Sequence, residues 1–237
     1  MSTKIEVPIR NISTNDIENS YIDEKIIDLN EKLLYIFTKR IIDIVGGVFG
    51  VILLIPIITI IYILKIFHKD KGSIFFTQER MGKNGKIFKM YKFRSMVIDA
   101  DEKLEEYLAQ NKEAEEEYRI YKKLKEDPRI TKVGNFLRRT SLDEFPQFIN
   151  VLKGDMSIVG PRPYLPREKN EMGEYYEYIV KSKPGITGFW QVAGRSDVTF
   201  KDRLSMDMDY CRNANLITDT KLVFKTIHKV IKKDGAC

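Results

Sequence analysis

The longest uninterrupted apolar stretch of the chain covers residues 44–64. It reads IVGGVFGVILLIPIITIIYIL and contains no charged side chain. About 20 consecutive apolar residues are what a helix needs to cross the hydrocarbon core of a bilayer. A buried core helix is the alternative, but few soluble domains contain so long an uncharged run. The pattern therefore predicts a membrane-inserted helix.

The flanks and the centre of this segment favour insertion from one side of the membrane. Lys39 and Arg40 precede it, and Lys65 and Lys69 follow it. A simple spanning helix has its positive charge biased to the cytoplasmic side, whereas both flanks are basic here. Pro56 lies near the middle, where it removes a backbone hydrogen bond and clashes with the preceding turn. We expect a re-entrant helix-break-helix hairpin, with a kinked spanning helix as the alternative.

A small β-hairpin is predicted after the apolar segment. Residues 73–78 and 86–93 have the aromatic and β-branched character of strands. The dipeptide Asn84-Gly85 between them is typical of a tight turn. A hairpin close to the membrane surface is the resulting prediction.

Helices are predicted for most of the remaining chain. Residues 97–126 are dense in Glu, Lys and Tyr, which indicates a solvated helix that ends at Asp127-Pro128. Further helices are expected over residues 143–152, 166–182 and 218–233. The last has an apolar stripe and many lysines, so it either docks on the domain or lies on the membrane surface. The predicted fold class is α+β, mainly helical, with amphipathic surface helices.

Charge and composition narrow the classes of partner. The formal net charge is +6, which favours a polyanionic partner such as nucleic acid, anionic lipid or a phosphorylated substrate. The basic residues are mixed with acidic ones and form no recognition motif, so we expect no nucleic-acid binding. The two cysteines, Cys211 and Cys237, form no CxxC motif, and the chain has only two histidines. A disulfide framework, a zinc site and a His-based metal site are therefore not expected.

The first chemically dense stretch is RRTSLDEFP, residues 138–146. Arg138 and its neighbour precede the adjacent carboxylates Asp143 and Glu144. Ser141 and Glu144 also have the spacing of a capping box, a purely structural device. A carboxylate can act as a nucleophile toward phosphorus, and guanidinium groups bind phosphate oxygens in bidentate fashion. Capping alone calls for neither the second carboxylate nor the arginine pair.

Two further stretches carry arginines in rigid or glycine-rich surroundings. Arg162 lies between two prolines within GDMSIVGPRP, residues 154–163, and is suited to phosphate binding or to a plain surface turn. Residues 183–195 read KPGITGFWQVAGR, with three glycines that allow close backbone approach to a ligand, and end at Arg195. Neither stretch is the GxxxxGK[ST] loop of ATP- and GTP-hydrolysing enzymes.

Taken together, these stretches resemble the bacterial sugar transferase family, the monotopic polyprenyl-phosphate phosphoglycosyl transferases. The matching segments are KMYKFRSM (89–96), FLRRTSLDEFPQFINVLKGDMSIVGPRPYLP (136–166), KPGITGFWQVAGR (183–195) and RLSMDMDYCRNANLITDTKLVFKTI (203–227). The resemblance begins near Phe37. Members have a re-entrant membrane helix broken at a proline, often in a Ser-Pro pair, where this chain has Ile55-Pro56.

The resemblance implies roles for particular residues. Asp143 and Glu144 match the catalytic Asp-Glu dyad, whose aspartate is the nucleophile and which works with Mg²⁺; both carboxylates are candidate metal ligands. The phosphate-handling cations implied in the same way are Lys92, Arg138, Arg162 and Arg195.

The resemblance also implies an activity and a location. A UDP-sugar would donate a hexose 1-phosphate, of glucose or galactose, to undecaprenyl (polyprenyl) phosphate through an aspartyl phosphosugar, with release of UMP. Residues 1–36 would be a polar N-terminal extension, 37–68 the re-entrant segment, and 69–237 a catalytic domain on the cytoplasmic face of the bacterial inner membrane. Membrane lipid is a further expected partner, and a homodimer is considered. The rival hypothesis is a membrane-anchored scaffold that binds nucleotide sugars without catalysis.

Overall fold

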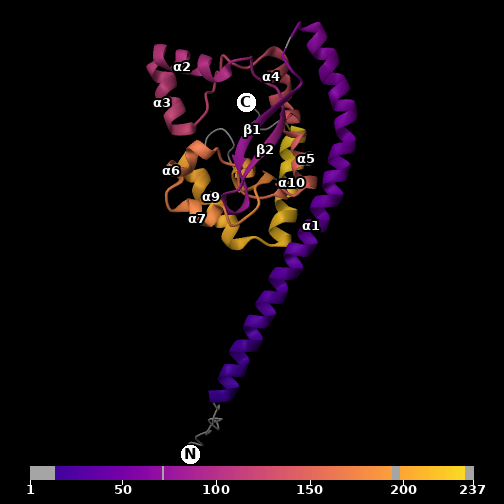
Figure 1. Ribbon diagram of the computed structural model, residues 1–237, viewed down its shortest axis with the longest axis vertical. Coiled ribbons are helices and arrows are strands. Elements are labelled where there is room, and N and C mark those ends of the chain that lie inside the picture. The colour runs from indigo at the N-terminus through magenta and orange to yellow at the C-terminus, as the bar shows by residue number, and fades with distance from the viewer. Residues whose placement is uncertain (1–13, 71, 194–197, 233–237) are drawn as a thin grey trace, which may run out of the picture. The chain divides into compact units, whose positions relative to one another are not determined.

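The computed structural model describes residues 14–70, 72–193 and 198–232. By Cα proximity the chain divides into Met1–Lys39 and Arg40–Cys237. Helices predominate, and two small two-stranded sheets complete the described secondary structure (Figure 1). This agrees with the predicted mainly helical fold that contains a β-hairpin.

The apolar segment lies in α1 (Thr14–Phe67), a helix of 54 residues with Pro56 inside it. The predicted helix-break-helix hairpin is therefore not confirmed, because the described helix continues through the proline. A proline removes only one hydrogen bond and can bend a helix without ending it. The Thr59 hydroxyl donates to the Ile55 carbonyl at 3.1 Å, a bond that often accompanies such bending. Residues Lys32–Phe67 are long and apolar enough to cross a membrane.

One stripe of α1 packs against the remainder of the second unit. Its buried members are Asp43, Gly47, Gly50, Leu54, Ile61 and Lys65. Their spacing of three, four or seven residues places them on one helix face. Side chains at Gly47 and Gly50 would collide with Leu152 and Phe148 on α5 (Gln147–Lys153), so the glycines permit close approach (Figure 1).

Two polar residues of α1 fix this docking. The Arg40 guanidinium donates to the carbonyls of Val151 and Leu152 at 2.8 and 2.9 Å, near the end of α5. Asp43 accepts from the Ser157 hydroxyl at 2.9 Å and from the backbone N–H of Ile158 at 2.8 Å. Because the buried Asp43 and the partly buried Arg40 both have hydrogen-bonding partners, the packing of α1 leaves neither charge without compensation.

The predicted hairpin is confirmed. Strands β1 (Phe75–Met81) and β2 (Ile87–Phe93) pair antiparallel. The 3-10 turn η1 (Lys83–Gly85) joins them, and Asn84 and Gly85 both have positive φ, at 58° and 74°. Strand β1 starts later than expected and runs three residues further, so that Arg80 lies within it.

Two of the predicted helices are each divided. The helix expected over 97–126 is α2 (Ala100–Gln110) and α3 (Lys112–Tyr121), because the Asn111 side chain caps α3 by accepting from the Ala114 N–H. The helix expected over 166–182 is η3 (Pro166–Glu168), α6 (Lys169–Met172) and α7 (Tyr175–Ile179). Gly173, at φ 53°, separates the last two. Single capping or left-handed residues thus end helices that the polar pattern would continue.

Further helices lie in the C-terminal part of the described residues. They are α8 (Phe189–Ala193), α9 (Phe200–Asn213) and α10 (Leu216–Lys232). Helix α10 matches its prediction and docks on the domain through the buried Leu222, which shares a cluster with Val159 and Tyr210. Phe224 and Ile227 on the same helix are exposed.

A short parallel pair was not predicted. It consists of β3 (Ser157–Val159) and β4 (Gly185–Thr187), and it brings two of the motif stretches together. Side chains at Gly160, Gly185 or Gly188 would collide with backbone atoms of the opposite segment. The glycines of this stretch were predicted to let the backbone approach a ligand. At Gly185 and Gly188 the close neighbour is instead the backbone of the facing segment.

Candidate active site

The adjacent carboxylates lie on a tight turn between two helices. They belong to the 3-10 turn η2 (Leu142–Glu144), which follows α4 (Lys132–Arg139) and precedes α5. Ser141 begins the turn at φ 57°, and its side chain makes no capping hydrogen bond. The capping-box interpretation of Ser141 and Glu144 is therefore wrong, and the Glu144 carboxylate is directed elsewhere.

Strand β2 supplies a cation to this turn. Lys92 Nζ lies 3.3 Å from Glu144 Oε1, and both side chains are partly exposed. Arg138, at the end of α4, donates from Nε to the Ser95 hydroxyl at 3.0 Å. The Ser95 carbonyl accepts from the Thr131 N–H at 3.1 Å, which ties the start of α4 to the segment after β2. The fold thus brings three of the predicted residues together around Asp143.

Burial changes the acidity of the candidate nucleophile. Desolvation raises the pKa of Asp143 to about 6, the neighbouring Glu144 adds to the rise, and Lys92 and Arg138 oppose it. A carboxylate with a raised pKa is more basic than an ordinary aspartate and is partly stripped of water. Both properties suit a nucleophile.

The two carboxylates of the dyad are suited to supply only part of the coordination sphere of Mg²⁺. Among the described residues no group of three or more His, Cys, Asp or Glu side chains could hold a metal ion. Mg²⁺ is commonly bound by one or two carboxylates, with water and substrate phosphates as its other ligands. The oxygen donors of Asp143 and Glu144 fit that pattern.

The backbone of the proline-flanked Arg162 is held by the buried Asp207. Oδ2 of Asp207, on α9, accepts from the backbone N–H of Arg162 at 2.9 Å and from the Tyr164 hydroxyl at 2.8 Å. The Arg162 guanidinium lies 5.4 Å from the centre of the Trp190 ring, within cation–π range. Burial raises the pKa of Asp207 to about 7.

Sequence reasoning missed two arginines of this region. Arg203 on α9 contacts the same Trp190 ring at 5.3 Å and is 2% exposed. Arg80 on β1 is 7% exposed, and its Nη1 donates to the Pro163 carbonyl at 2.8 Å. The charges of both Arg162 and Glu144 act on the pKa of Arg80, so this arginine lies within electrostatic range of both parts of the site. Extending the first predicted strand past Gln78 would have placed Arg80 within the hairpin.

The fourth predicted cation, Arg195, lies outside the described residues. Of the others, Lys92 and Arg138 surround the dyad, whereas Arg162 lies with Trp190 and Arg203.

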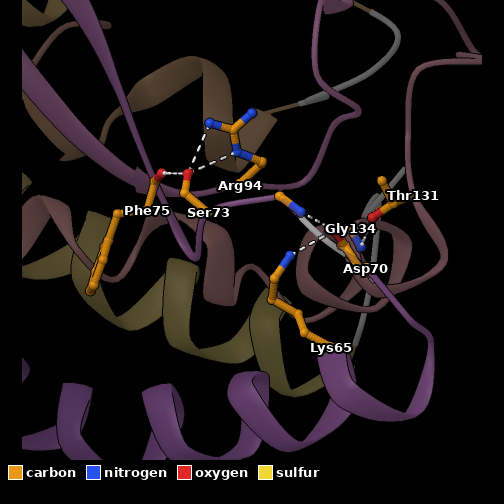
Figure 2. A network of polar contacts seen from close by, with 8 residues as sticks. Lys65, Asp70, Ser73, Phe75, Arg94, Thr131 and Gly134 are labelled. Atoms are coloured by element: carbon orange, nitrogen blue, oxygen red, sulfur yellow. Dashed lines mark hydrogen bonds and ion pairs between the residues drawn. The ribbon is translucent and has the colours of Figure 1, made fainter.

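A separate polar network fixes the connection from α1 to the hairpin (Figure 2). Lys65 forms an ion pair of 2.8 Å with Asp70, and Arg94 donates to the Ser73 hydroxyl from Nε and Nη2. Ser73 in turn donates to the Phe75 carbonyl at the start of β1. A cavity of about 490 Å³ lies nearby, lined by residues that include His68, and none of the predicted site residues lines it.

Comparison with known proteins places the chain in a family. A family model described as "Bacterial sugar transferase" matches residues 34–233. An undecaprenyl-phosphate galactose phosphotransferase of Salmonella typhimurium is 45% identical over 200 residues, which are 84% of this chain and 42% of that protein. A UDP-galactose-lipid carrier transferase of Erwinia amylovora is 44% identical over the same shares of both chains.

A relative of similar length also matches. The exopolysaccharide production protein ExoY of Sinorhizobium fredii is 42% identical over 199 residues, which are 84% of this chain and 88% of that protein. The chain thus spans less than half of the two enterobacterial relatives but most of ExoY. Because the family match covers the dyad, the arginines and the whole apolar segment, the chain belongs to the bacterial sugar transferase family.

Proposed function

We propose that this protein transfers a hexose 1-phosphate, of glucose or galactose, from a UDP-sugar to undecaprenyl phosphate. The observation that carries the proposal is the placement of Asp143 and Glu144 beside Lys92 and Arg138, in a domain docked on an apolar helix. The names of two relatives, an undecaprenyl-phosphate galactose phosphotransferase and a UDP-galactose-lipid carrier transferase, support the acceptor and the donor. The name of ExoY, an exopolysaccharide production protein, supports a role in exopolysaccharide synthesis. We propose that the reaction is the first membrane step of exopolysaccharide, capsule or O-antigen synthesis.

The reaction proceeds in two displacements at phosphorus. An Asp143 carboxylate oxygen attacks the β-phosphorus of the UDP-sugar, and the bond from that phosphorus to the bridging oxygen breaks, so that UMP leaves with the oxygen. A phosphate oxygen of the polyprenyl phosphate then attacks the phosphorus of the aspartyl phosphosugar. The carboxylate leaves, and a polyprenyl diphosphate sugar is formed. A reaction divided into two steps by a covalent intermediate predicts ping-pong kinetics.

The surrounding residues supply positive charge and position. Lys92 orients Glu144 through their ion pair, and Arg138 and Arg162 offer guanidinium groups to the phosphate oxygens. Mg²⁺ bound by Asp143 and Glu144 would neutralise charge on the transferring phosphoryl group. Arg195 is the remaining proposed phosphate ligand.

The proposed location follows from the same acceptor. Polyprenyl phosphate is a lipid, so the domain must work at a membrane surface, and we place it on the cytoplasmic face of the bacterial inner membrane where nucleotide sugars are available. The basic flanks of the apolar segment would favour anionic headgroups. The re-entrant hairpin at Pro56 and a homodimer stay predictions.

Release of UMP tests the function. The purified protein is incubated with Mg²⁺, undecaprenyl phosphate and each of several UDP-sugars, and UMP is measured. We expect release from UDP-glucose or UDP-galactose and a loss of about 1,000-fold or more in Asp143→Asn, because removal of a nucleophile abolishes the covalent route. The matched control is Asp202→Asn, at the exposed start of α9.

A second readout separates catalysis from binding. Donor labelled in the sugar and its phosphate should leave label on the wild-type protein when the acceptor is omitted, and none on Asp143→Asn. Labelling of that variant would contradict the assignment of the nucleophile. Binding of UDP-sugar without any release of UMP would favour the scaffold hypothesis instead.

A further inference from the structure

Arg80 is a buried cation whose hydrogen-bonding capacity is only partly used. Its Nη1 donates to the Pro163 carbonyl at 2.8 Å and its Nη2 to the Gln78 side-chain carbonyl at 2.6 Å. Its Nε is buried and has no hydrogen-bond partner among the described residues. A buried guanidinium donor without a hydrogen bond costs free energy, and an acceptor supplied from outside the chain would relieve that cost.

Arg162 lies within electrostatic range of Arg80 and shares one aromatic ring with Arg203. Arg162 and Arg203 are 5.4 and 5.3 Å from the centre of Trp190. Arg203 uses Nε and Nη2 on the carbonyls of Val198 and Tyr121, so it contributes charge and packing. Arg162 keeps part of its surface exposed and lies on the accessible side of the group.

The described carboxylates offset this positive charge only through space, without a direct ion pair. Within the described ranges no Asp or Glu lies within 4 Å of Arg80, Arg162 or Arg203 in an ion pair. Asp207 directs one oxygen at the Tyr164 hydroxyl and at a backbone N–H, and its other oxygen is buried without a partner. Glu144 and Glu168 raise the pKa of Arg80 only from a distance.

The burial of these arginines and their mutual repulsion lower the pKa values of Arg80 and Arg203. Burial lowers the pKa of Arg80 to about 9 and that of Arg203 to about 10, and in both cases the charge of Arg162 is the next contribution. Like charges held together in a poorly solvated place are stabilised by a multivalent anion. A diphosphate, with several oxygens over a short distance, has the matching charge and geometry.

We propose that Arg80, Arg162 and Arg203 form an anion site for the diphosphate of the sugar donor, with Arg80 as a phosphate-binding residue. This assignment rests on the proposed function for the identity of the anion. Arg80 Nε and the Arg162 guanidinium bind the diphosphate oxygens, and Arg203 adds charge through its contact with Trp190. The donor is thereby held within electrostatic range of Glu144, which adjoins the nucleophile.

Trp190 provides a direct readout because it is the only tryptophan in the chain. Its fluorescence is followed in detergent, with EDTA present, during titration with pyrophosphate, UDP, uridine and farnesyl phosphate. We expect saturable changes with pyrophosphate and UDP but not with uridine, which lacks phosphate. Farnesyl phosphate, a short isoprenyl phosphate, represents the lipid source of the same chemistry and should bind more weakly than UDP.

Variants then test Arg80 itself. Arg80→Lys keeps the charge but loses Nε and the planar fork, so we expect about tenfold weaker binding of UDP and pyrophosphate, the size of one charge-assisted hydrogen bond. Arg119→Lys, in an exposed ion pair on α3, is the control and should bind as the wild type does. Thermal unfolding of each variant shows whether it is folded. If Arg80→Lys does not fold, the ligand series on the wild-type protein still tests the anion site.

The outcomes separate this assignment from the proposed function. Unchanged affinity of a folded Arg80→Lys for pyrophosphate and UDP overturns the anion site, even if UMP release confirms the transferase. Equal changes with uridine overturn it too. Preferential binding of farnesyl phosphate overturns the donor assignment. If UDP and pyrophosphate bind through Arg80 but no UDP-sugar releases UMP, the site stands and the proposed function fails.

Discussion

Asp143 and Asp207 both have raised pKa values, but their surroundings give them different roles. Asp143 keeps part of its surface exposed and has Lys92 and Arg138 within electrostatic range, so a substrate can reach it. Asp207 is 0% exposed and holds the Arg162 backbone and the Tyr164 hydroxyl. These surroundings suit the first to the proposed chemistry and the second to positioning the loop that carries Arg162.

The pKa of Asp207 predicts a pH-dependent stability. Because its folded pKa of about 7 is above the ordinary 3.8, ionisation favours the unfolded chain, so its contribution falls as pH rises from about 4 to about 7. Asp207→Asn removes this titration. Relative to the variant, the wild type should lose unfolding free energy between pH 5 and pH 7, by up to about 1.4 kcal/mol per pH unit.

Urea unfolding in detergent, followed for both proteins at several pH values, measures that difference. Groups that titrate in both proteins cancel. A difference that stays constant between pH 5 and pH 8 would show that Asp207 is ionised throughout.

At the scale of elements, close backbone contacts decide how α4 presents the dyad. The Thr131 hydroxyl accepts from the Gly134 N–H at 2.9 Å and caps α4. A side chain at Gly134 would collide with the Ser95 carbonyl, which accepts from the Thr131 N–H. The hydroxyl of the same Ser95 accepts from Arg138. The register of α4 on the segment after β2 therefore places Arg138 near Asp143.

Gly134→Ala tests this register. The added methyl must push α4 away from Ser95, and overpacking of this kind costs about 1–3 kcal/mol or more. We expect lower unfolding free energy together with at least a several-fold loss of UMP release, because Arg138 moves with the helix.

Gly173→Ala is the matched control for Gly134→Ala. Its added methyl meets no atom within 4 Å, and its backbone, at φ 53° and ψ −133°, costs about 1–3 kcal/mol of strain for a residue other than glycine. It should lower stability without the same loss of activity. If both variants kept full activity, the contact of α4 with Ser95 would not position the site.

At the scale of the whole molecule, α1 has two different surfaces between Arg40 and Phe67. The buried stripe packs on the domain, whereas large apolar side chains elsewhere on the helix are exposed; they include Ile44, Val45, Val48, Phe49, Ile52, Ile55, Ile60 and Ile63. Soluble proteins rarely expose so large a contiguous apolar surface. We expect lipid to cover this surface, whether the segment returns at Pro56 or spans the bilayer.

The topology of α1 can be measured with cysteine reporters. Cys211 and Cys237 are replaced by serine, and Lys39→Cys and Lys69→Cys are introduced one at a time. A membrane-impermeant maleimide is then applied to right-side-out and inverted vesicles. We expect both reporters to react only in inverted vesicles, because both basic flanks favour the cytoplasmic side. Reaction from opposite sides would establish a spanning helix instead.

The sequence alone determined the features that depend on local pattern. The uncharged run of α1, the hairpin at Asn84-Gly85 and the last helix follow from hydrophobicity and turn chemistry over short distances. The dyad and its cations were predicted from the resemblance of the motif stretches to a known family, and their roles in the reaction stay predictions. The breaks at Asn111 and Gly173 were missed, since one residue outweighed a helical pattern on both sides.

Only the tertiary structure decided which charges meet. Arg162 and Arg203 lie far apart in the chain, and packing places both against the Trp190 ring, whereas Arg80 reaches the loop of Arg162 through the Pro163 carbonyl. The turn of Glu144 toward Lys92 rather than toward Ser141 is likewise settled by the packing of β2 on η2. Hydrogen bonds and electrostatic contacts between distant segments depend on that packing, and no local pattern encodes them.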